Sequence, residues 1–310
     1  MSDDPRGLAR RLALALRDEV APALGAHAGR THAGAGPGGD VTFAIDEEAE
    51  SFMEEFLADN APGFAFYSED RGLVEPAGGD ARWVLVVDPI DGTRPAMAGF
   101  EAACVSVALA ELVGGEPTMG DVVAGCIVEL KSGRAFYAER GGGLDPAPSL
   151  SANRDLGRMF WAYGLRGRPM RAIAEVIGEL IDASSVGGGT FDLGSATYDM
   201  TRIATGQLDA YVEPGPRMVA DVPGMRERFE QVGGGAVLNN SPYDLAAAAL
   251  CVEEAGAVVS DAYGAPLAER PLLGSGAEFQ ISCVAAANAD LHRQILESIE
   301  RGIERLAERI

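Results

Sequence analysis

The spacing of hydrophobic and polar residues predicts a chain in which helices and short strands alternate. Apolar residues recur at helical spacing in six stretches, which predict helices at 6–23, 47–60, 170–182, 195–205, 243–255 and 289–308. Shorter runs rich in β-branched and aromatic residues predict strands at 64–67, 83–88, 103–110, 121–130, 134–138, 208–213, 258–261 and 281–286. The glycine-rich stretch 25–39 is predicted to be a loop.

The order of these elements favours a layered α+β fold over strict β-α-β winding, because strands and helices come in runs. A Gly- and Pro-rich segment at 143–152 separates two halves. A second irregular stretch, 214–242, contains one candidate short helix, MRERFEQ at 225–231. Neither a sequence repeat nor a coiled-coil heptad is evident.

Composition narrows the possible partners and the location. The 310 residues carry a formal net charge of −22, which disfavours binding to nucleic acid or to an anionic membrane. No apolar run reaches the roughly 18 residues that a membrane-spanning helix needs. The N-terminus reads as an amphipathic helix, not a signal peptide, so a cytoplasmic protein is expected. The 4 cysteines lie in apolar runs and predict buried free thiols, not a zinc site.

The chemistry begins where the predicted strand 83–88 ends in the run DPIDGT, residues 88–93. Asp88 and Asp91 cannot both follow the alternation of a strand, but a turn at the proline lets both point into one site. Two close carboxylates repel, and a divalent cation such as Mg²⁺ removes that penalty. Gly92 permits close backbone approach, and Thr93 offers a hydroxyl. A helix that starts here would hold a phosphate with its free N–H groups. The alternative is a plain turn with aspartate caps.

A phospho-aspartate mechanism is disfavoured by the same run. Phosphatases of that type use a D-x-D-x-T motif, which would place the nucleophilic aspartate at position 89, where this chain has Pro89. A metal-activated water is therefore the expected nucleophile.

Three further acidic residues stand at the ends of predicted elements. Glu69 follows the strand 64–67, Asp46 precedes the second helix, and Asp244 lies in the run SPYD that opens the helix 243–255. Each also has a structural interpretation. Asp46 could be an N-cap, Ser241 with Asp244 fits a capping box, and Glu69 could be a solvated loop acid.

Taken in order, the motifs closely resemble the inositol monophosphatase superfamily, a group of Mg²⁺-dependent, lithium-sensitive phosphatases. The group includes some fructose-1,6-bisphosphatases and nucleotide 3′-phosphatases. The motifs are D-V-T at 40–42, I-D at 45–46, A-E at 49–50, S-E-D at 68–70, DPIDGT, G-S-A at 194–196, D-A-Y-V-E at 209–213 and Y-D-L-A-A at 243–247. The resemblance runs from about residue 40 to the C-terminal CVAAANADLH. It implies an αβαβα sandwich and a homodimer.

The resemblance also implies two to three Mg²⁺ ions. A first ion would be held by Glu69, Asp88 and the Ile90 carbonyl, and a second by Asp88, Asp91 and Asp244. A third, looser ion would sit near Glu69. Residues 1–310 would form a single fold whose N-terminal half, 1–145, carries most of these ligands. The C-terminal half, 153–310, would carry Asp244 and the substrate side.

The remaining roles follow from the resemblance in the same way. Asp46 with Thr93 would orient and deprotonate the attacking water, and the amides of Gly92 and Thr93 would hold the phosphate. The alcohol side of the substrate would be lined by Gly194, Ser195 and Glu213.

At three places the sequence departs from the family pattern, which limits how far the family's residue roles can be carried over to this chain. Asp70 replaces a usual second glutamate, which should leave the metal site intact. The residues after Thr93 include Arg94 and Glu101 where relatives often have an Asn-Phe pair. The insertion 214–242 should lie beside the pocket, as a lid, a surface excursion or part of a dimer contact.

The expected function is hydrolysis of a small phosphorylated polyol or sugar, with inositol-1-phosphate as the default. The alternatives are fructose-1,6-bisphosphate, 3′-phosphoadenosine-5′-phosphate and histidinol phosphate. An alternative of another class is a non-catalytic metal- or ligand-binding protein on the same fold.

Overall fold

The computed structural model describes residues 4–26, 32–35, 41–79, 81–112 and 116–309. Its α-helices are α1 (Arg6–Val20), α2 (Ala44–Asn60), α3 (Thr93–Ala98), α4 (Met170–Ser184), α5 (Ala196–Ala204), α6 (Gly215–Asp221), α7 (Met225–Val232), α8 (Pro242–Glu254) and α9 (Ala289–Glu308). Its strands are β1 (His32–Ala35), β2 (Val41–Phe43), β3 (Ala65–Ser68), β4 (Gly72–Val74), β5 (Trp83–Asp91), β6 (Cys104–Glu111), β7 (Val122–Glu129), β8 (Ala135–Glu139), β9 (Gly143–Asp145), β10 (Phe160–Tyr163), β11 (Gly189–Phe191), β12 (Ala210–Glu213), β13 (Val258–Ser260) and β14 (Cys283–Ala286).

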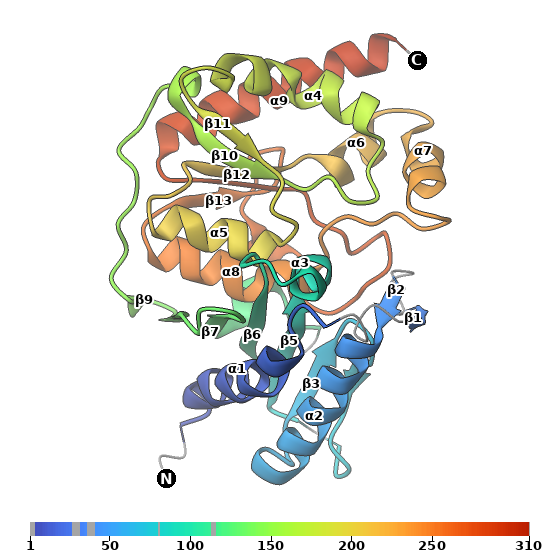
Figure 1. Cartoon of the computed structure of the whole chain (residues 1–310), viewed down its shortest axis with the longest axis vertical. Helices are drawn as coiled ribbons and strands as arrows, with labels where there is room; N and C mark the ends of the chain where they lie inside the picture. Colours follow the sequence, from blue (N-terminus) through green and yellow to red (C-terminus); the bar gives the residue numbers. More distant parts are fainter. Residues whose placement is uncertain (1–3, 27–31, 36–40, 80, 113–115, 310) are drawn as a thin grey trace.

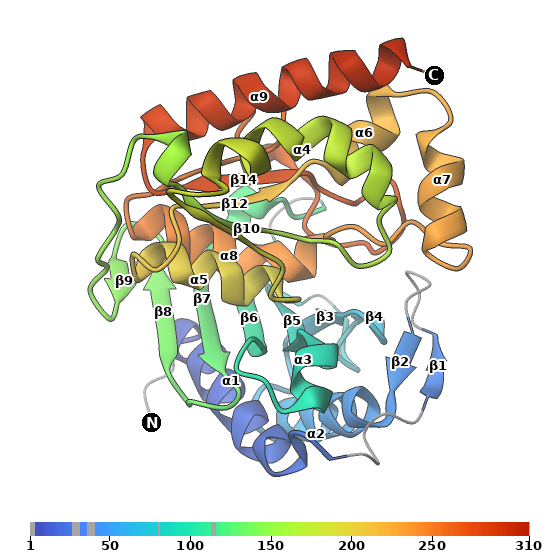
Figure 2. The same cartoon turned by 45° about the horizontal axis from the view of Figure 1, so that its top comes forward.

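Two sheets form the framework. Within the described residues, one sheet has the strand order β4-β3-β5-β6-β7-β8-β9 and the other β11-β10-β12-β14-β13, while β1 and β2 pair as a separate hairpin. Helices α1 and α2 cover one face of the first sheet, and α5 and α8 cover the other. The second sheet lies on the far side of α5 and α8, and α4 and α9 close its outer face (Figures 1 and 2). The expected αβαβα layering is therefore confirmed.

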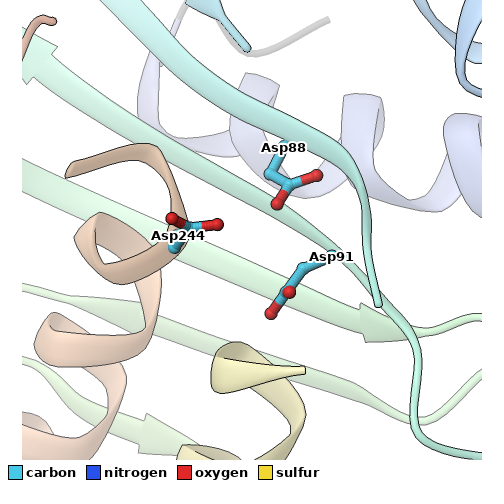
Figure 3. Close-up of side chains that lie close together, drawn as sticks. All are labelled: Asp88, Asp91 and Asp244. Carbon is cyan, nitrogen blue, oxygen red and sulfur yellow. The ribbon is translucent and has the colours of Figure 1, made fainter. Parts of the chain in front are cut away.

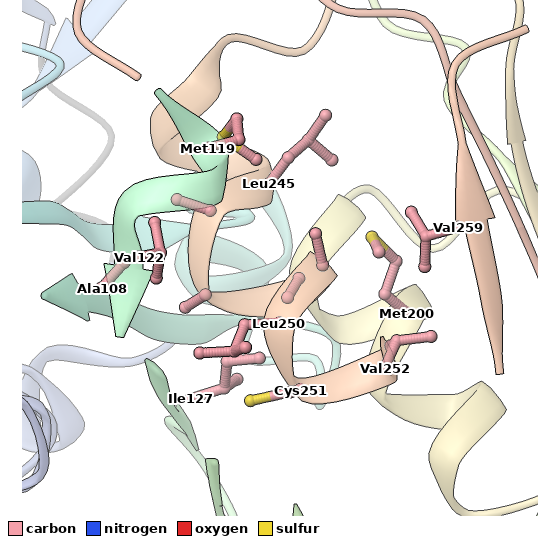
Figure 4. Close-up of a cluster of buried hydrophobic side chains, with 14 of the residues drawn as sticks. Ala108, Met119, Val122, Ile127, Met200, Leu245, Leu250, Cys251, Val252 and Val259 are labelled. Atoms are coloured by element: carbon pink, nitrogen blue, oxygen red, sulfur yellow. The ribbon is translucent and has the colours of Figure 1, made fainter. Parts of the chain in front are cut away.

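The central helix α8 has the composition that its position requires. It lies between two sheets, and its run from Leu245 to Val252 is buried on every side. A helix that is apolar all round is expected in such a place (Figure 4). Its alanines allow a close approach to the sheet, since a Cβ added at Gly125 on β7 would lie 3.1 Å from the Ala247 Cα.

The insertion 214–242 is part of the outer layer. It contains α6, which was not predicted, and α7, which matches the predicted short helix. Met218, Met225 and Phe229 have no exposed surface and belong to the core beneath α4 and α9. Arg217 donates to Glu300 on α9 and to the Ala262 carbonyl. This segment is therefore built into the fold, not laid over its surface.

Other sequence predictions need correction. Strand β5 continues beyond position 88 to Asp91, and the short strands β4, β9, β10 and β11 were not predicted. Strand β1 lies inside the stretch 25–39 that was predicted to be a loop, while positions 27–31 and 36–40, with the first residue of D-V-T, lie outside the described residues. None of the helices in the described ranges is long and apolar enough to cross a membrane.

Candidate active site

The end of β5 brings Asp88 and Asp91 into one space. The pairing of β5 with β6 shifts register between these two residues, so the strand's alternation is interrupted between them. The Ile90 amide donates to Asp88 Oδ1 at 3.0 Å, which stabilises the backbone at this irregularity. Figure 3 shows Asp88 and Asp91 close to Asp244, which lies in the first turn of α8. An irregularity within β5, not a turn that ends the strand, therefore brings the two aspartates into one space.

Asp244 completes the acidic cluster from the other half of the chain. It is the third residue of α8, and its Oδ2 accepts the Ser241 amide at 2.6 Å in a capping box. One carboxylate oxygen from each of Asp88, Asp91 and Asp244 lies within 4.8 Å of the others. Asp244 thus caps its helix and also joins the cluster, so the two interpretations of its sequence position are compatible.

Burial and mutual repulsion disfavour the charged forms of these acids. Burial raises the pKa of Asp88 well above its usual value, and the neighbouring charges of Asp91, Asp244 and Glu69 raise it further. Burial, followed by the charge of Asp91, raises the pKa of Asp244 to about 8. A buried group of oxygen donors that resists ionisation fits a hard divalent cation, which would favour the charged forms.

Asp91 also links the two halves of the molecule. Its Oδ2 accepts the Ser195 hydroxyl at 2.8 Å and the Thr197 amide at 2.6 Å, both at the start of α5. These hydrogen bonds oppose the rise that burial causes in the pKa of Asp91. Ser195 also caps α5, because its Oγ accepts the Tyr198 amide at 3.0 Å.

Thr93 and Asp46 form a hydrogen-bonded pair beside the cluster. The Thr93 hydroxyl lies 3.1 Å from Asp46 Oδ1 and 3.2 Å from the Ile90 carbonyl, either of which can accept its proton. Asp46 is the third residue of α2, not its N-cap, and its Oδ2 accepts the Phe43 amide at 2.9 Å. One Asp46 oxygen therefore has a backbone donor, and the other lies within hydrogen-bond distance of the Thr93 hydroxyl.

Gly92 is required by the backbone between these groups. Its φ is +92°, and an added Cβ would lie 2.6 Å from the Ala102 carbonyl oxygen and 2.9 Å from the Ser195 Cβ. Only glycine fits this turn without displacement of backbone. Its conformation lets α3 begin at Thr93, directly after the acidic run.

A cavity of about 210 Å³ opens over the acidic cluster. Glu69, Ile90 and Thr93 line it, so three residues expected at the site share its wall with the aspartates. A second, smaller cavity of about 70 Å³ shares Asp91 and Asp244 with the first and is lined in part by Gly194 and Ser195.

Several residues that line these cavities were not found from the sequence. Arg166, Asp192 and Asn239 line both, and Arg168 and Asp199 line the smaller one. Asn239 belongs to the insertion, so the expected proximity of that segment to the pocket was its only sequence signal. The two arginines lie in the run GLRGRP, which carries no motif that marks a site.

Glu213, which is expected to line the alcohol side of the substrate, contacts Arg168 in this structure. Its side chain has no exposed surface. One carboxylate oxygen binds Arg168, and the other accepts the Gly215 amide at 2.8 Å. Glu213 lies behind Arg168 and is not among the residues that line either cavity.

The residues near the site that differ from the family motifs make contacts outside the acidic cluster. Asp70 accepts the Thr42 hydroxyl at 2.7 Å. The Arg94 guanidinium lies over the Phe43 ring, and Glu101 pairs with Lys131 at the surface.

Comparison with known proteins agrees with the motifs. The model of the inositol monophosphatase family matches residues 6–304. A fructose-1,6-bisphosphatase/inositol-1-monophosphatase of Methanothermobacter thermautotrophicus is 28% identical over 95% of this chain and 96% of its own. An inositol-1-monophosphatase of Mesorhizobium japonicum is 28% identical over 86% of this chain and 85% of its own. The solved structure of the extragenic suppressor protein suhB from Bartonella henselae has a TM-score of 0.71 at 23% identity, covering 95% of this chain and 97% of that one.

Proposed function

The chain belongs to the inositol monophosphatase family of phosphoric monoester hydrolases, and we propose that it cleaves a small phosphorylated polyol or sugar with Mg²⁺ as cofactor. The observation that carries the proposal is the acidic cluster of Asp88, Asp91 and Asp244 at the floor of a cavity, with the Thr93–Asp46 pair beside it.

The donor set fits Mg²⁺. Asp88 with Glu69 and the Ile90 carbonyl would hold one ion, and Asp88 with Asp91 and Asp244 a second. All of these donors are oxygens, as a hard cation prefers, and a third ion near Glu69 would complete the set. Bound there, the ions would lower the pKa of a water molecule and offset the negative charge of the phosphoryl group.

The attacking water would be oriented by Thr93 and Asp46. The Thr93 hydroxyl donates to Asp46 or to the Ile90 carbonyl and leaves its own oxygen as an acceptor for the water. Asp46 is held by the Phe43 amide, so its carboxylate is fixed in direction and can receive the proton that the water loses.

The phosphoryl group would lie over the turn that Gly92 makes possible. The amides of Gly92 and Thr93 stand at the start of α3, where backbone donors have no intrahelical partner. The leaving alcohol would extend toward Gly194 and Ser195, which line the smaller cavity.

Among the candidate esters, inositol-1-phosphate is the substrate that we propose first. Two relatives over most of the chain are named inositol-1-monophosphatases. Fructose-1,6-bisphosphate is the second candidate, because the Methanothermobacter relative carries both names.

Phosphate release from both esters tests the proposal, with 3′-phosphoadenosine-5′-phosphate and histidinol phosphate as comparison substrates. We expect release from a polyol or sugar ester with Mg²⁺ and none with EDTA. Magnesium-independent release, or none from any ester, would overturn the proposal. Asp18→Asn, at an exposed position on α1, is a matched control for aspartate substitutions in the cluster.

Family membership supports three further expectations, which are proposals for this chain: inhibition by Li⁺, a homodimer and a cytoplasmic location. Adding Li⁺ to the Mg²⁺ assay tests the first, and light scattering of the purified chain tests the second. Cell fractionation tests the third.

A further inference from the structure

Arg94 places a positive charge at the wall of the larger cavity. Among the described residues that line this cavity, the cations are Arg94 and Arg166, and the acids are Glu69, Asp88, Asp91, Asp192 and Asp244. Arg94 directly follows Thr93 in α3, and it is exposed to solvent. It is therefore a cation at the cavity and next in sequence to Gly92 and Thr93, whose amides would hold the phosphoryl group.

The charges of this wall favour an additional cation beside the phosphoryl group. In the proposed function, the acids that would hold two Mg²⁺ ions balance the charge of those ions. A phosphomonoester carries a charge of about −1.5 to −2 at pH 7. It would still meet Asp192 in the wall and a chain with a net charge of −22. An arginine in the wall offsets this repulsion, and its planar group can bind two phosphate oxygens at once.

The two arginines of the wall have different surroundings. Burial raises the pKa of Asp91 and of Asp244, and the charge of Arg166 opposes both rises, so Arg166 lies near these acids. The Arg94 guanidinium instead lies over the Phe43 ring, 5.7 Å from the ring centroid. A stack on an aromatic ring restrains an arginine and does not itself use the N–H donors, which lie in the plane of the guanidinium.

The contact with Phe43 also ties Arg94 to the Thr93–Asp46 pair. Phe43 immediately precedes α2, and its amide donates to Asp46 at 2.9 Å. The Thr93 hydroxyl lies 3.1 Å from the other oxygen of Asp46. Thr93 and Arg94 thus both contact the start of α2, one through a hydrogen bond and the other through an aromatic ring. The charge of Arg94 is therefore held beside the residues that would orient the attacking water.

Building on the proposed function, we infer that Arg94 is a further substrate-contact residue, whose guanidinium binds the non-bridging oxygens of the phosphoryl group over Gly92 and Thr93. The family pattern often has an asparagine at this position, so the contact is a feature of this chain and not of the motif. The same contact would hold the product phosphate after the alcohol has left. Arg94 therefore sets the affinity for the ester and for inorganic phosphate, while other residues select the alcohol.

Inorganic phosphate tests the contact without turnover. We expect it to raise the melting temperature of the Mg²⁺-loaded wild type in a concentration-dependent way. Arg94→Gln removes the charge and should need about 10-fold more phosphate for the same rise, as for loss of one charge-assisted hydrogen bond at an exposed site. Arg94→Lys keeps the charge without the planar fork and should lie between the two. Arg134→Gln, at an exposed arginine that stacks on the buried Phe136, should match wild type.

Three further measurements separate this contact from other causes. Mg²⁺ alone should stabilise Arg94→Gln at least as much as wild type, because the substitution removes a cation and no metal ligand. The difference in phosphate affinity should shrink as NaCl is raised, because salt screens exposed charges. With inositol-1-phosphate as substrate, Arg94→Gln should raise KM by about 10-fold and change kcat little.

Wild-type phosphate affinity in Arg94→Gln, or an equal loss in Arg134→Gln, would overturn the contact. Loss of Mg²⁺ stabilisation in Arg94→Gln would also overturn it, because the effect would then come from the metal site. If Arg94→Gln does not fold, Arg94→Lys decides, and wild-type phosphate affinity in that variant would overturn the guanidinium contact. A wild type that releases phosphate from an ester but gains no stability from phosphate would overturn the contact and leave the proposed function in place. Release from no ester would overturn the proposed function first, and the contact with it.

Discussion

Replacing Asp91 with asparagine separates the structural role of the acidic cluster from its chemical role. The asparagine oxygen can keep the hydrogen bonds from the Ser195 hydroxyl and the Thr197 amide, which both reach one oxygen of Asp91. The amide nitrogen then faces the carboxylates of Asp88 and Asp244 as a donor. The metal-free variant should therefore be more stable than wild type, while metal binding and turnover should be lost.

The size of the expected gain in stability follows from the distances within the acidic cluster. The three carboxylate oxygens lie within 4.8 Å of one another. Two unit charges at that separation repel by roughly 3.5 kcal/mol at an effective dielectric constant of about 20. Part of this repulsion is already relieved by protonation, because the pKa of Asp244 is raised to about 8. We therefore expect Asp91→Asn to raise the free energy of unfolding by about 1–2 kcal/mol in EDTA at neutral pH.

Urea unfolding with EDTA and with saturating Mg²⁺ measures both effects. Wild type should gain about 2.7 kcal/mol when free Mg²⁺ is one hundred times its dissociation constant, and Asp91→Asn should gain much less. Phosphate release by the variant should be abolished. A variant that is less stable than wild type in EDTA would refute the repulsion argument. One that gains as much from Mg²⁺ would refute the role of Asp91 as a ligand.

Three further substitutions test other parts of the structure. Burial raises the pKa of Glu50 to about 7, so the folded protein favours the protonated carboxyl. This contribution to the free energy of unfolding is fully present below about pH 4.5 and is lost as the pH rises to 7. The stability difference of Glu50→Gln over wild type should therefore grow by up to about 3 kcal/mol across that range, and a constant difference in urea titrations would contradict this. Thr93→Ala should lower kcat by roughly 10²- to 10⁴-fold with little change in KM, and unchanged turnover would remove Thr93 from the mechanism. Arg202→Ala leaves the buried Glu129 unpaired and should cost about 3–5 kcal/mol, against less than about 1 kcal/mol for Arg293→Ala in an exposed pair; equal costs would contradict the argument.

The helices and long strands could be predicted because their patterns are periodic over many residues. The four-residue strand β10 reads FWAY and shows no alternation, so its pairing with β11 and β12 was not evident. Helix α6 begins with Gly215-Pro216, which locally favours a turn. Its helical form depends on tertiary contacts, since Met218 is fully buried and Arg217 binds Glu300 on α9, which is far away in the sequence.

The same distinction applies to the site. The acids of the run DPIDGT and Asp244 could be located because each stands at a recognisable element end with a local chemical signature. The position of Glu213 could not be predicted, because it depends on the contact with Arg168. Nothing in the sequence around either residue indicates that the two side chains meet. The position of Asn239 could not be predicted for a related reason. It lies on a long connection, and the path of that connection determines where the side chain lies.

The position of the insertion between β12 and α8 has a consequence for how this protein can change. The cluster acids sit at the end of β5 and in the first turn of α8, and none of them lies on the connection itself. The parts of that connection outside α6 and α7 can therefore change while the acids stay fixed, whereas α6 and α7 are held by the core packing of Met218, Met225 and Phe229. The wall of the larger cavity thus combines fixed acids with residues 237–239 of the connection, and this is the part of the wall that can vary in sequence without moving the acids.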